Sequence, residues 1–241
     1  MAPGQARTQR LELEFGGFLV DLDGTLIDST NAIVQNWAAV GRETGTNPST
    51  ILEMSHGRRS LDVLRLVAPE MASWDYAREI ESRIPHTYGH LATEIPGAAS
   101  FLDSLEFWSA PWAIVTSSTA PLATGWLNWF NLPFPKPGRL ITAESVSVGK
   151  PDPSCYLLGH SSLHLDNNDS EILAIEDSPA GIMAAKEANC KVLGLLTSHR
   201  YEQIAASRPE WIARDLNSIQ SVRKNGKRYA ILIDSLDLSQ S

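Results

Sequence analysis

Short apolar runs that end in polar or turn residues recur along this chain of 241 residues. The first is Gly17–Val20, and similar runs cover residues 112–116, 140–142, 172–176 and 192–196. Runs of this length, bounded by turn residues, are typical of strands buried on both faces of a parallel sheet. The pattern therefore predicts a strand at each of these positions.

Between these runs, apolar residues recur at helical spacing. Helices are predicted near residues 98–108, 121–130, 153–163 and 179–188, so strands and helices alternate along the second part of the chain. Alternation of this kind predicts an α/β fold with a doubly wound parallel sheet. Near the C-terminus, the dipeptide Asn225-Gly226 is a hairpin signal and predicts a small hairpin at the sheet edge.

The stretch from about residue 30 to 92 interrupts this alternation. It contains no convincing strand pattern, and Asp28 is a candidate N-cap for its first helix. Apolar spacing predicts helices over 29–42, 49–54, 60–67 and 74–83. The first strand is thus separated from the rest of the sheet by a helical segment.

This interruption predicts two structural units. The inserted segment is expected to fold as a helical domain of residues 29–94, and the core domain then comprises residues 11–28 and 95–241. Residues 1–10 carry two arginines and no acid, and they lack the length and amphipathic pattern of a targeting peptide. We expect a disordered tail there.

Composition narrows the class of protein. The formal net charge of −8 argues against nonspecific nucleic-acid binding, and no apolar stretch is long enough to span a bilayer. Cys155 and Cys190 are the only cysteines, which argues against a disulfide-stapled secreted scaffold. Trp126, Trp129 and Phe130 are interpreted as packing residues. We expect a cytoplasmic monomer with neither nucleic acid nor membrane as a partner.

Polar side chains suited to chemistry follow three of the predicted strands and occupy one turn. They are two acids, a hydroxyl pair, a lysine and an acid pair: Asp21, Asp23, Thr116, Ser117, Lys150, Glu176 and Asp177. In an open α/β sheet, ligands bind beyond the carboxyl ends of the strands. We therefore expect these residues to converge on one site.

These positions resemble the four motifs of the haloacid dehalogenase superfamily, whose members transfer phosphoryl groups through an aspartyl phosphate. The motifs fall, in chain order, on Asp21-x-Asp23, Thr116, Lys150 and Glu176-Asp177. The resemblance implies a Rossmann-like core with a helical cap formed by residues 29–94. It also implies a Mg²⁺-dependent phosphatase.

A second group of segments narrows the resemblance to the fungal glycerol-3-phosphate and 2-deoxyglucose-6-phosphate phosphatases, over about residues 15–220. The segments are Ser55-His56-Gly57, Arg59, Ile84-Pro85, Tyr88-Gly89, Glu94–Ala98, Gly149–Pro151 and Glu176–Ile182. The likeness implies a small phosphorylated metabolite as substrate. Glycerol phosphate, a hexose 6-phosphate, a deoxyhexose phosphate and a polyol phosphate all satisfy it, and the sequence does not rank them.

Elementary chemistry suggests a role for each core residue. The Asp21 carboxylate is ionised at neutral pH and can attack phosphorus. Asp23 can give a proton to the departing alkoxide and later take one from water. Lys150 offsets the negative charge, while Thr116 and Ser117 are candidate ligands of the phosphate oxygens.

The crowded acids also predict a metal site, because carboxylates repel one another unless a cation or a shared proton lies between them. Oxygen ligands in a phosphate-handling site favour Mg²⁺. Asp21 and Asp23 are candidate ligands, and the resemblance implies that Asp23 acts through its backbone carbonyl. Asp177 is expected to be a further ligand, with Glu176 also possible.

Two residues of the inserted segment are candidate substrate ligands. His56 and Arg59 resemble positions at which family members contact the polar end of the substrate; the alternative is a solvated helix N-terminus. Arg58 departs from the aromatic or aliphatic residue usual at its position. Either arginine can therefore be the one that faces the site.

Three functions compete at this point. The first is a phosphatase, and the second is a phosphosugar mutase of the same fold. Such mutases carry a histidine five residues after an acid that corresponds to Asp28, where this chain has Ile33. The third is a sugar-phosphate sensor that has lost its chemistry, which the complete set of catalytic residue types disfavours. A dehalogenase is disfavoured by Asp23, which such enzymes lack.

Overall fold

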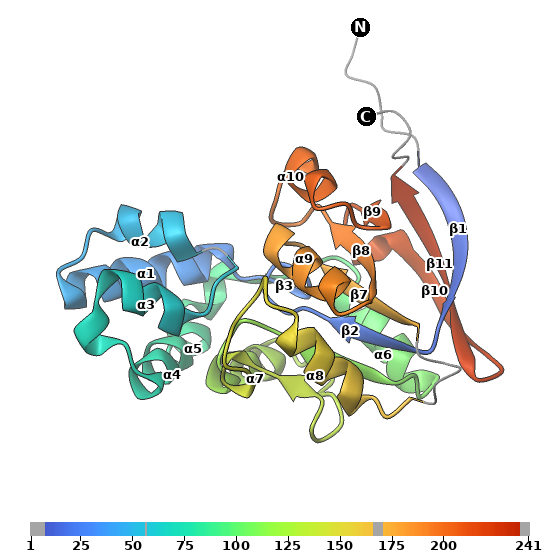
Figure 1. Cartoon of the computed structure of the whole chain (residues 1–241), viewed down its shortest axis with the longest axis horizontal. Coiled ribbons are helices and arrows are strands. Elements are labelled where there is room, and N and C mark those ends of the chain that lie inside the picture. Colours follow the sequence, from blue (N-terminus) through green and yellow to red (C-terminus); the bar gives the residue numbers. More distant parts are fainter. Residues whose placement is uncertain (1–7, 56, 166–170, 237–241) are drawn as a thin grey trace, which may run out of the picture.

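A six-stranded parallel sheet forms the centre of the molecule in the computed structural model, which describes residues 8–55, 57–165 and 171–236 (Figure 1). The strand order is β6-β5-β2-β7-β8-β9. The strands are β2 Gly17–Val20, β5 Trp112–Val115, β6 Leu140–Ile141, β7 Ile172–Glu176, β8 Lys191–Leu195 and β9 Trp211–Ala213. The five predicted strands are confirmed, and β9 adds a sixth that the sequence reasoning missed.

Helices cover both faces of this sheet, as its apolar strands require. Along β2, Phe18 and Val20 belong to one hydrophobic cluster and Leu19 belongs to another, because successive side chains point to opposite faces. The helices that follow the strands are α6 Ala98–Phe107, α7 Ala120–Trp129, α8 Ser154–Ser162, α9 Pro179–Glu187 and α10 Tyr201–Ala206, with 3₁₀ turns at Ala143–Ser145 and Leu216–Ser218. The predicted doubly wound α/β fold is confirmed.

A separate antiparallel sheet lies beside the core, at the right of Figure 1. Its order is β1-β11-β10, with β1 at Thr8–Phe15, β10 at Ile219–Asn225 and β11 at Arg228–Leu236. The hairpin predicted at Asn225-Gly226 is present, but it pairs with β1 and not with the edge of the parallel sheet. Residues 8–10 also lie in β1, so the predicted tail is wrong for them, and residues 1–7 lie outside the described part of the chain.

Within the described residues, the inserted segment consists of helices and the turns between them from Thr30 to Leu91. Its elements are α1 Thr30–Thr44, α2 Pro48–Ser55, α3 Ser60–Val67, η1 Pro69–Met71, α4 Trp74–Ser82, α5 Ile84–Tyr88 and η2 Gly89–Leu91. Residues such as Trp37, Ile51, Leu64 and Ile80 give these helices a hydrophobic cluster of their own. The four predicted helices are therefore present, although the N-cap residue of α1 is Ser29 and not Asp28.

The chain enters and leaves this helical segment at one point. There β3, Ile27–Asp28, pairs antiparallel with β4, Thr93–Glu94. The helices lie to one side of the sheet in Figure 1, next to α7. We refer to α1–α5 as the cap; the domain boundaries predicted at residues 29 and 94 fall beside this strand pair and stay a prediction. Within the described ranges, no helix has the length and apolar character needed to cross a membrane.

Candidate active site

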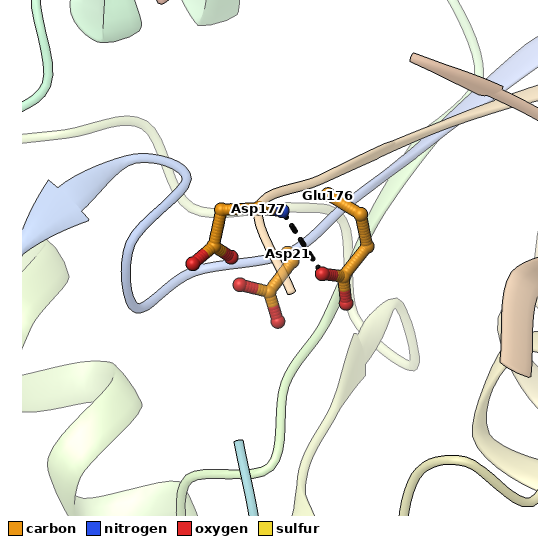
Figure 2. Close-up of side chains that lie close together, drawn as sticks. All are labelled: Asp21, Glu176 and Asp177. Atoms are coloured by element: carbon orange, nitrogen blue, oxygen red, sulfur yellow. Dashed lines mark hydrogen bonds between the residues drawn. The ribbon is translucent and has the colours of Figure 1, made fainter. Parts of the chain in front are cut away.

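Three carboxyl groups meet at the carboxyl edge of the parallel sheet. Figure 2 shows Asp21, Glu176 and Asp177 facing one another, and an oxygen of each lies within 4.8 Å of an oxygen of the others. Asp21 follows β2, and the acid pair stands at the end of β7; these strands are neighbours in the sheet. All three residues are buried. The sheet therefore brings them together as the sequence predicted.

Lys150 is the cation that pairs with these acids. Its Nζ lies 2.6 Å from Asp21 Oδ1 and 2.7 Å from Glu176 Oε1, and it donates to the Val115 carbonyl at 3.0 Å. An ammonium group has three N–H donors, so these contacts satisfy all of them. Burial favours the neutral amine, but the adjoining Asp21 and Glu176 carboxylates raise the pKa of Lys150. The lysine is therefore a fixed positive charge beside Asp21.

Glu176 is the more fully bonded member of the acid pair. Its Oε1 accepts hydrogen bonds from Lys150 and from the Tyr156 hydroxyl at 3.0 Å. Its Oε2 accepts the backbone N–H groups of Asp177 and Ser178 and the Ser178 hydroxyl, each at 3.0 Å. These bonds hold Lys150 and the start of α9, so Glu176 is suited to a structural role.

The Asp177 carboxylate accepts fewer hydrogen bonds than that of Glu176. Its Oδ1 accepts the Thr25 hydroxyl at 3.0 Å, and its Oδ2 accepts the Ser198 hydroxyl. It also lies very close to Gly24, whose φ is +90°, and a Cβ at that residue would lie 2.1 Å from Asp177 Oδ2. Only glycine combines this backbone conformation with the absence of a side chain. The turn after β2 thus brings its backbone up to Asp177.

The electrostatics of this cluster fit a divalent cation. Burial raises the pKa of Asp21 well above its usual value, with Glu176 and Asp177 adding to the increase and Lys150 opposing it. Burial, followed by the Glu176 charge, raises the pKa of Asp177 to about 7. One lysine does not balance the charge of three buried carboxylates, whereas a divalent cation beside it would. The donor set consists of hard oxygens, which Mg²⁺ prefers.

Asp23 stands apart from this cluster and points to different partners. Its Oδ1 accepts the Ser29 hydroxyl at 2.6 Å and the Trp126 indole N–H at 3.1 Å, while its Oδ2 accepts the Ser118 hydroxyl. Burial raises the pKa of Asp23, and these three donors oppose the increase. A carboxyl group with a raised pKa is suited to giving up a proton and taking one back.

The sequence reasoning missed these partners of Asp23. The Trp126 ring is buried, in agreement with its predicted packing role, but its indole N–H also reaches the site. Ser118 directly follows the predicted hydroxyl pair, and Ser29 directly precedes α1. The position of both serines next to predicted site elements was the available signal.

Thr116 and Ser117 follow β5 and line the same site. Thr116 is buried, and its hydroxyl accepts the backbone N–H of Ser118 at 3.0 Å. Ser117 donates its hydroxyl to the Gly57 carbonyl of the cap at 3.2 Å. The predicted hydroxyl residues are therefore at the site, and one of them also contacts the cap.

A cavity of about 120 Å³ lies between the cap and the carboxyl edge of the sheet. Asp21, Asp23, Thr116, Lys150 and Asp177 line its core side. The cap side carries both apolar and polar residues: Ile33, Val34, Asn36, Trp37, Arg58, Ser60, Glu81 and Ile84. The core and the cap thus both contribute residues to the lining of one cavity.

The structure gives Arg59 a different place from the one expected. Its guanidinium pairs with Asp62 at 2.7 Å and donates to the Val146 and Ser147 carbonyls at 2.8 and 3.1 Å. Arg59 does not appear among the residues that line the cavity, whereas the exposed Arg58 does. Arg59 therefore attaches the cap to the core, and the expectation that it binds substrate is not supported. His56 lies outside the described residues.

Glu81 makes a second contact between cap and core. Its Oε2 accepts the backbone N–H of Thr119 at 2.7 Å, and its Oε1 accepts the hydroxyl of Ser60. Burial raises the pKa of Glu81 from 4.5 to about 7. Between pH 4.5 and 7, the Glu81 carboxyl group therefore keeps its proton in the folded protein and has lost it in the unfolded chain.

This difference predicts a pH-dependent effect of Glu81→Gln on stability. Protein stability falls as pH rises from 4.5 to 7, because the unfolded chain binds fewer protons over that range. A glutamine amide at this position does not titrate, so it removes this loss of stability. It can still accept a hydrogen bond from the Thr119 backbone N–H and donate one to the Ser60 hydroxyl. We expect equal stability near pH 4.5 and a gain of up to about 3 kcal/mol above pH 7.

Urea unfolding at pH 5 and pH 8 measures this effect. Glu79→Gln on the same helix is the matched control, because the Glu79 side chain is 69% exposed. A difference between Glu81→Gln and the original protein that does not change with pH would contradict the assignment of a raised pKa.

The doubly wound sheet, the acid and lysine cluster at its carboxyl edge and the helical cap together define a hydrolase of one class. The chain belongs to the haloacid dehalogenase-like hydrolase family, whose sequence model matches residues 18–195. A hydrolase from Pseudomonas syringae has a similar fold, with a TM-score of 0.68 at 22% identity over 83% of this chain and 94% of that one. The predicted family is confirmed.

Characterised relatives extend over most of the chain. It is 33% identical to glycerol-1-phosphate phosphohydrolase 2 of Saccharomyces cerevisiae, over 88% of this chain and 87% of that protein. It is 37% identical to hexitol phosphatase A of Escherichia coli, over 74% and 82%. It is 30% identical to 2-deoxyglucose-6-phosphate phosphatase 1 of S. cerevisiae, over 90% and 94%. Two of these relatives are phosphatases by name, and the first is a phosphohydrolase.

Proposed function

We propose that this protein is a Mg²⁺-dependent phosphatase that hydrolyses a small sugar or polyol phosphate through an aspartyl-phosphate intermediate. Its named relatives share one activity, the hydrolysis of phosphoric monoesters. The observation that carries the proposal is the convergence of Asp21, Lys150 and Asp177 beneath a cap, in one cavity with Asp23. Each of these residues has a distinct task in phosphoryl transfer.

In the first half-reaction, a carboxylate oxygen of Asp21 attacks phosphorus and the bond from phosphorus to the ester oxygen breaks. The departing alkoxide takes the proton of Asp23, so the alcohol leaves as a neutral molecule. The raised pKa of Asp23 supports this role, because it favours the protonated form. Lys150, 2.6 Å from Asp21, offsets the charge that gathers there.

In the second half-reaction, water attacks the phosphorus of the aspartyl phosphate. Asp23, now ionised, takes a proton from that water, and the bond between phosphorus and the Asp21 oxygen breaks. Inorganic phosphate and the free Asp21 carboxylate result. Asp23 ends this step protonated, so one turnover restores both acids to their starting states.

Mg²⁺ would be held by Asp21 and Asp177, with the backbone carbonyl of Asp23 as a further ligand by family resemblance. When bound, it would supply positive charge to the phosphate and keep the carboxylates ionised. Glu176 is the weaker candidate as a ligand, since both of its oxygens already accept several hydrogen bonds. Thr116 and Ser117 are proposed to contact the phosphate oxygens.

The cap argues for a small substrate. Arg59 and Glu81 bond it to the core, and a cavity of about 120 Å³ lies between cap and core. A polyol or sugar leaving group suits the mixed polar and apolar lining of that cavity, and a phosphoprotein does not. The predicted monomeric state and cytoplasmic location remain predictions.

The mutase alternative has less support. Ile33 lines the cavity. It stands at the position where the phosphosugar mutases of this fold carry a histidine. An isoleucine side chain cannot transfer a proton, so this wall of the cavity offers no equivalent group. The inactive sensor is also less favoured, because the cavity holds all of the residue types that the chemistry needs.

A phosphate-release screen tests the proposal. With Mg²⁺ present, we expect sugar and polyol phosphates to give higher kcat/KM values than nucleoside monophosphates or phosphopeptides. Glycerol 1-phosphate, sorbitol 6-phosphate and 2-deoxyglucose 6-phosphate are the first compounds to compare. If nucleotides or phosphopeptides led the screen, the proposed substrate class would be wrong.

A further inference from the structure

One polar group on the cap side of the cavity has no hydrogen-bond partner among the residues that the structure describes. Asn36, on α1, is 2% exposed, and no donor among the described residues reaches its side-chain oxygen Oδ1. A buried carbonyl oxygen without a hydrogen bond is costly, and native structures contain few of them. Asn36 also lines the cavity that contains Asp21. Oδ1 itself is fully buried, so a rotation of the side-chain amide about its Cβ–Cγ bond would have to turn it toward the cavity. A molecule bound there can then supply the missing donor.

The surroundings of Asn36 restrict what that donor can be. On α1, Ile33 and Trp37 line the same wall, so the amide stands within an apolar surface. The ligand group beside Asn36 must also donate a hydrogen bond, because the atom without a partner is a carbonyl oxygen. A carbon chain that carries hydroxyl groups satisfies both conditions, because its carbons contact the apolar wall and a hydroxyl can donate to Oδ1.

We propose that Asn36 binds a hydroxyl group of the leaving alcohol and thereby sets a preference for polyol phosphates over unsubstituted alkyl phosphates. This inference rests on the proposed phosphatase function and adds a specificity residue to it. A site built to bond a hydroxyl discriminates strongly against an analogue that lacks it, because the buried partner is then left without a bond. Asn36 has no part in the chemical steps and acts on the choice of ester.

Two pairs of esters test this role: glycerol 1-phosphate with propyl phosphate, and sorbitol 6-phosphate with hexyl phosphate. Each pair has the same carbon number and differs in its hydroxyl groups. We expect Asn36→Leu to lower the ratio of kcat/KM for polyol over alkyl ester by at least about 10-fold, the value of one hydrogen bond. Asn31→Leu on the same helix is the matched control, because Asn31 is exposed and should leave the ratio unchanged.

The possible outcomes separate the two proposals. Equal losses for both esters of a pair would mean that Asn36 only supports the fold, and the inference would be overturned. An original protein that hydrolyses polyol and alkyl esters equally well would overturn it too. An original protein that hydrolyses no phosphate ester would instead refute the proposed function. If Asn36→Leu fails to fold, Asn36→Ala, checked by thermal melting, provides the same comparison of ratios.

Discussion

Asp21→Asn is expected to lower kcat by at least about 10⁴-fold while leaving the protein folded, because an amide cannot attack phosphorus. The side chains have the same shape, so the packing at the end of β2 is preserved. Lys150 keeps two partners in the variant, Glu176 and the Val115 carbonyl. The substitution also removes one of three crowded buried acids, so we expect little change in melting temperature.

Phosphate release with the preferred ester measures the loss, and acid trapping of the protein during turnover detects the phosphoenzyme. The original protein should yield a trapped phosphoenzyme, and the variant should yield none. Asp103→Asn, at an exposed position of α6, is the matched control and should retain full activity. Turnover within about 10-fold of the original by folded Asp21→Asn would refute covalent catalysis by this residue.

The parallel core could be predicted from sequence because two simple signals coincide there. Buried strands leave short continuous apolar runs, and the residues after each run must lie at one edge of a parallel sheet. Gly17–Val20 and 172–176 show both signals, and their strands are neighbours in the structure. The convergence of Asp21 with Asp177 therefore followed from local pattern and topology alone.

The hairpin of the antiparallel sheet was predicted, but its third strand, β1, was not. Leu11, Leu13 and Phe15 alternate with Glu12 and Glu14, which is the period-two pattern of a half-exposed strand. The signal was present, but it lay beside a tail with no pattern at all. The partner of this strand, β11, is more than 200 residues away, as the pairing of Thr8 with Leu236 shows. Sequence order gives no indication of such a pairing.

Residues of the cap were the least predictable, because their roles depend on how the cap sits on the core. Arg58 and Arg59 are adjacent in sequence, yet only Arg58 lines the cavity, while Arg59 bonds to the core loop at Val146 and Ser147. Likewise, Asn36 and Glu81 lie on helices whose spacing indicates only which face is apolar. Which polar residue faces a ligand is decided by tertiary contact.

Removal of divalent metal is expected to abolish activity, and added Mg²⁺ is expected to restore it. The physical reason is the charge of the cluster: Asp21, Glu176 and Asp177 lie within 4.8 Å of one another, with Lys150 as the paired cation. A phosphate dianion cannot enter beside these acids without further positive charge. Ca²⁺ is expected to inhibit, since its larger and more flexible coordination sphere misplaces the reacting groups.

The two acids after β7 should respond differently to substitution. Asp177→Ala should raise the Mg²⁺ concentration required for half-maximal activity by about 100-fold or more, because a direct ligand is lost. Glu176→Gln should chiefly lower thermal stability, because Lys150, Tyr156 and the backbone at Ser178 all bond to that carboxylate.

Binding can be measured apart from turnover, since a metal that binds only the folded protein raises its melting temperature. The original protein should show a Mg²⁺-dependent increase, which Asp177→Ala should lose at the same Mg²⁺ concentration. Full activity in excess chelator would refute the metal requirement. If Glu176→Gln abolished the Mg²⁺-dependent increase while Asp177→Ala preserved it, the ligand would be Glu176, and the dense hydrogen bonding of that carboxylate would have to rearrange when metal binds.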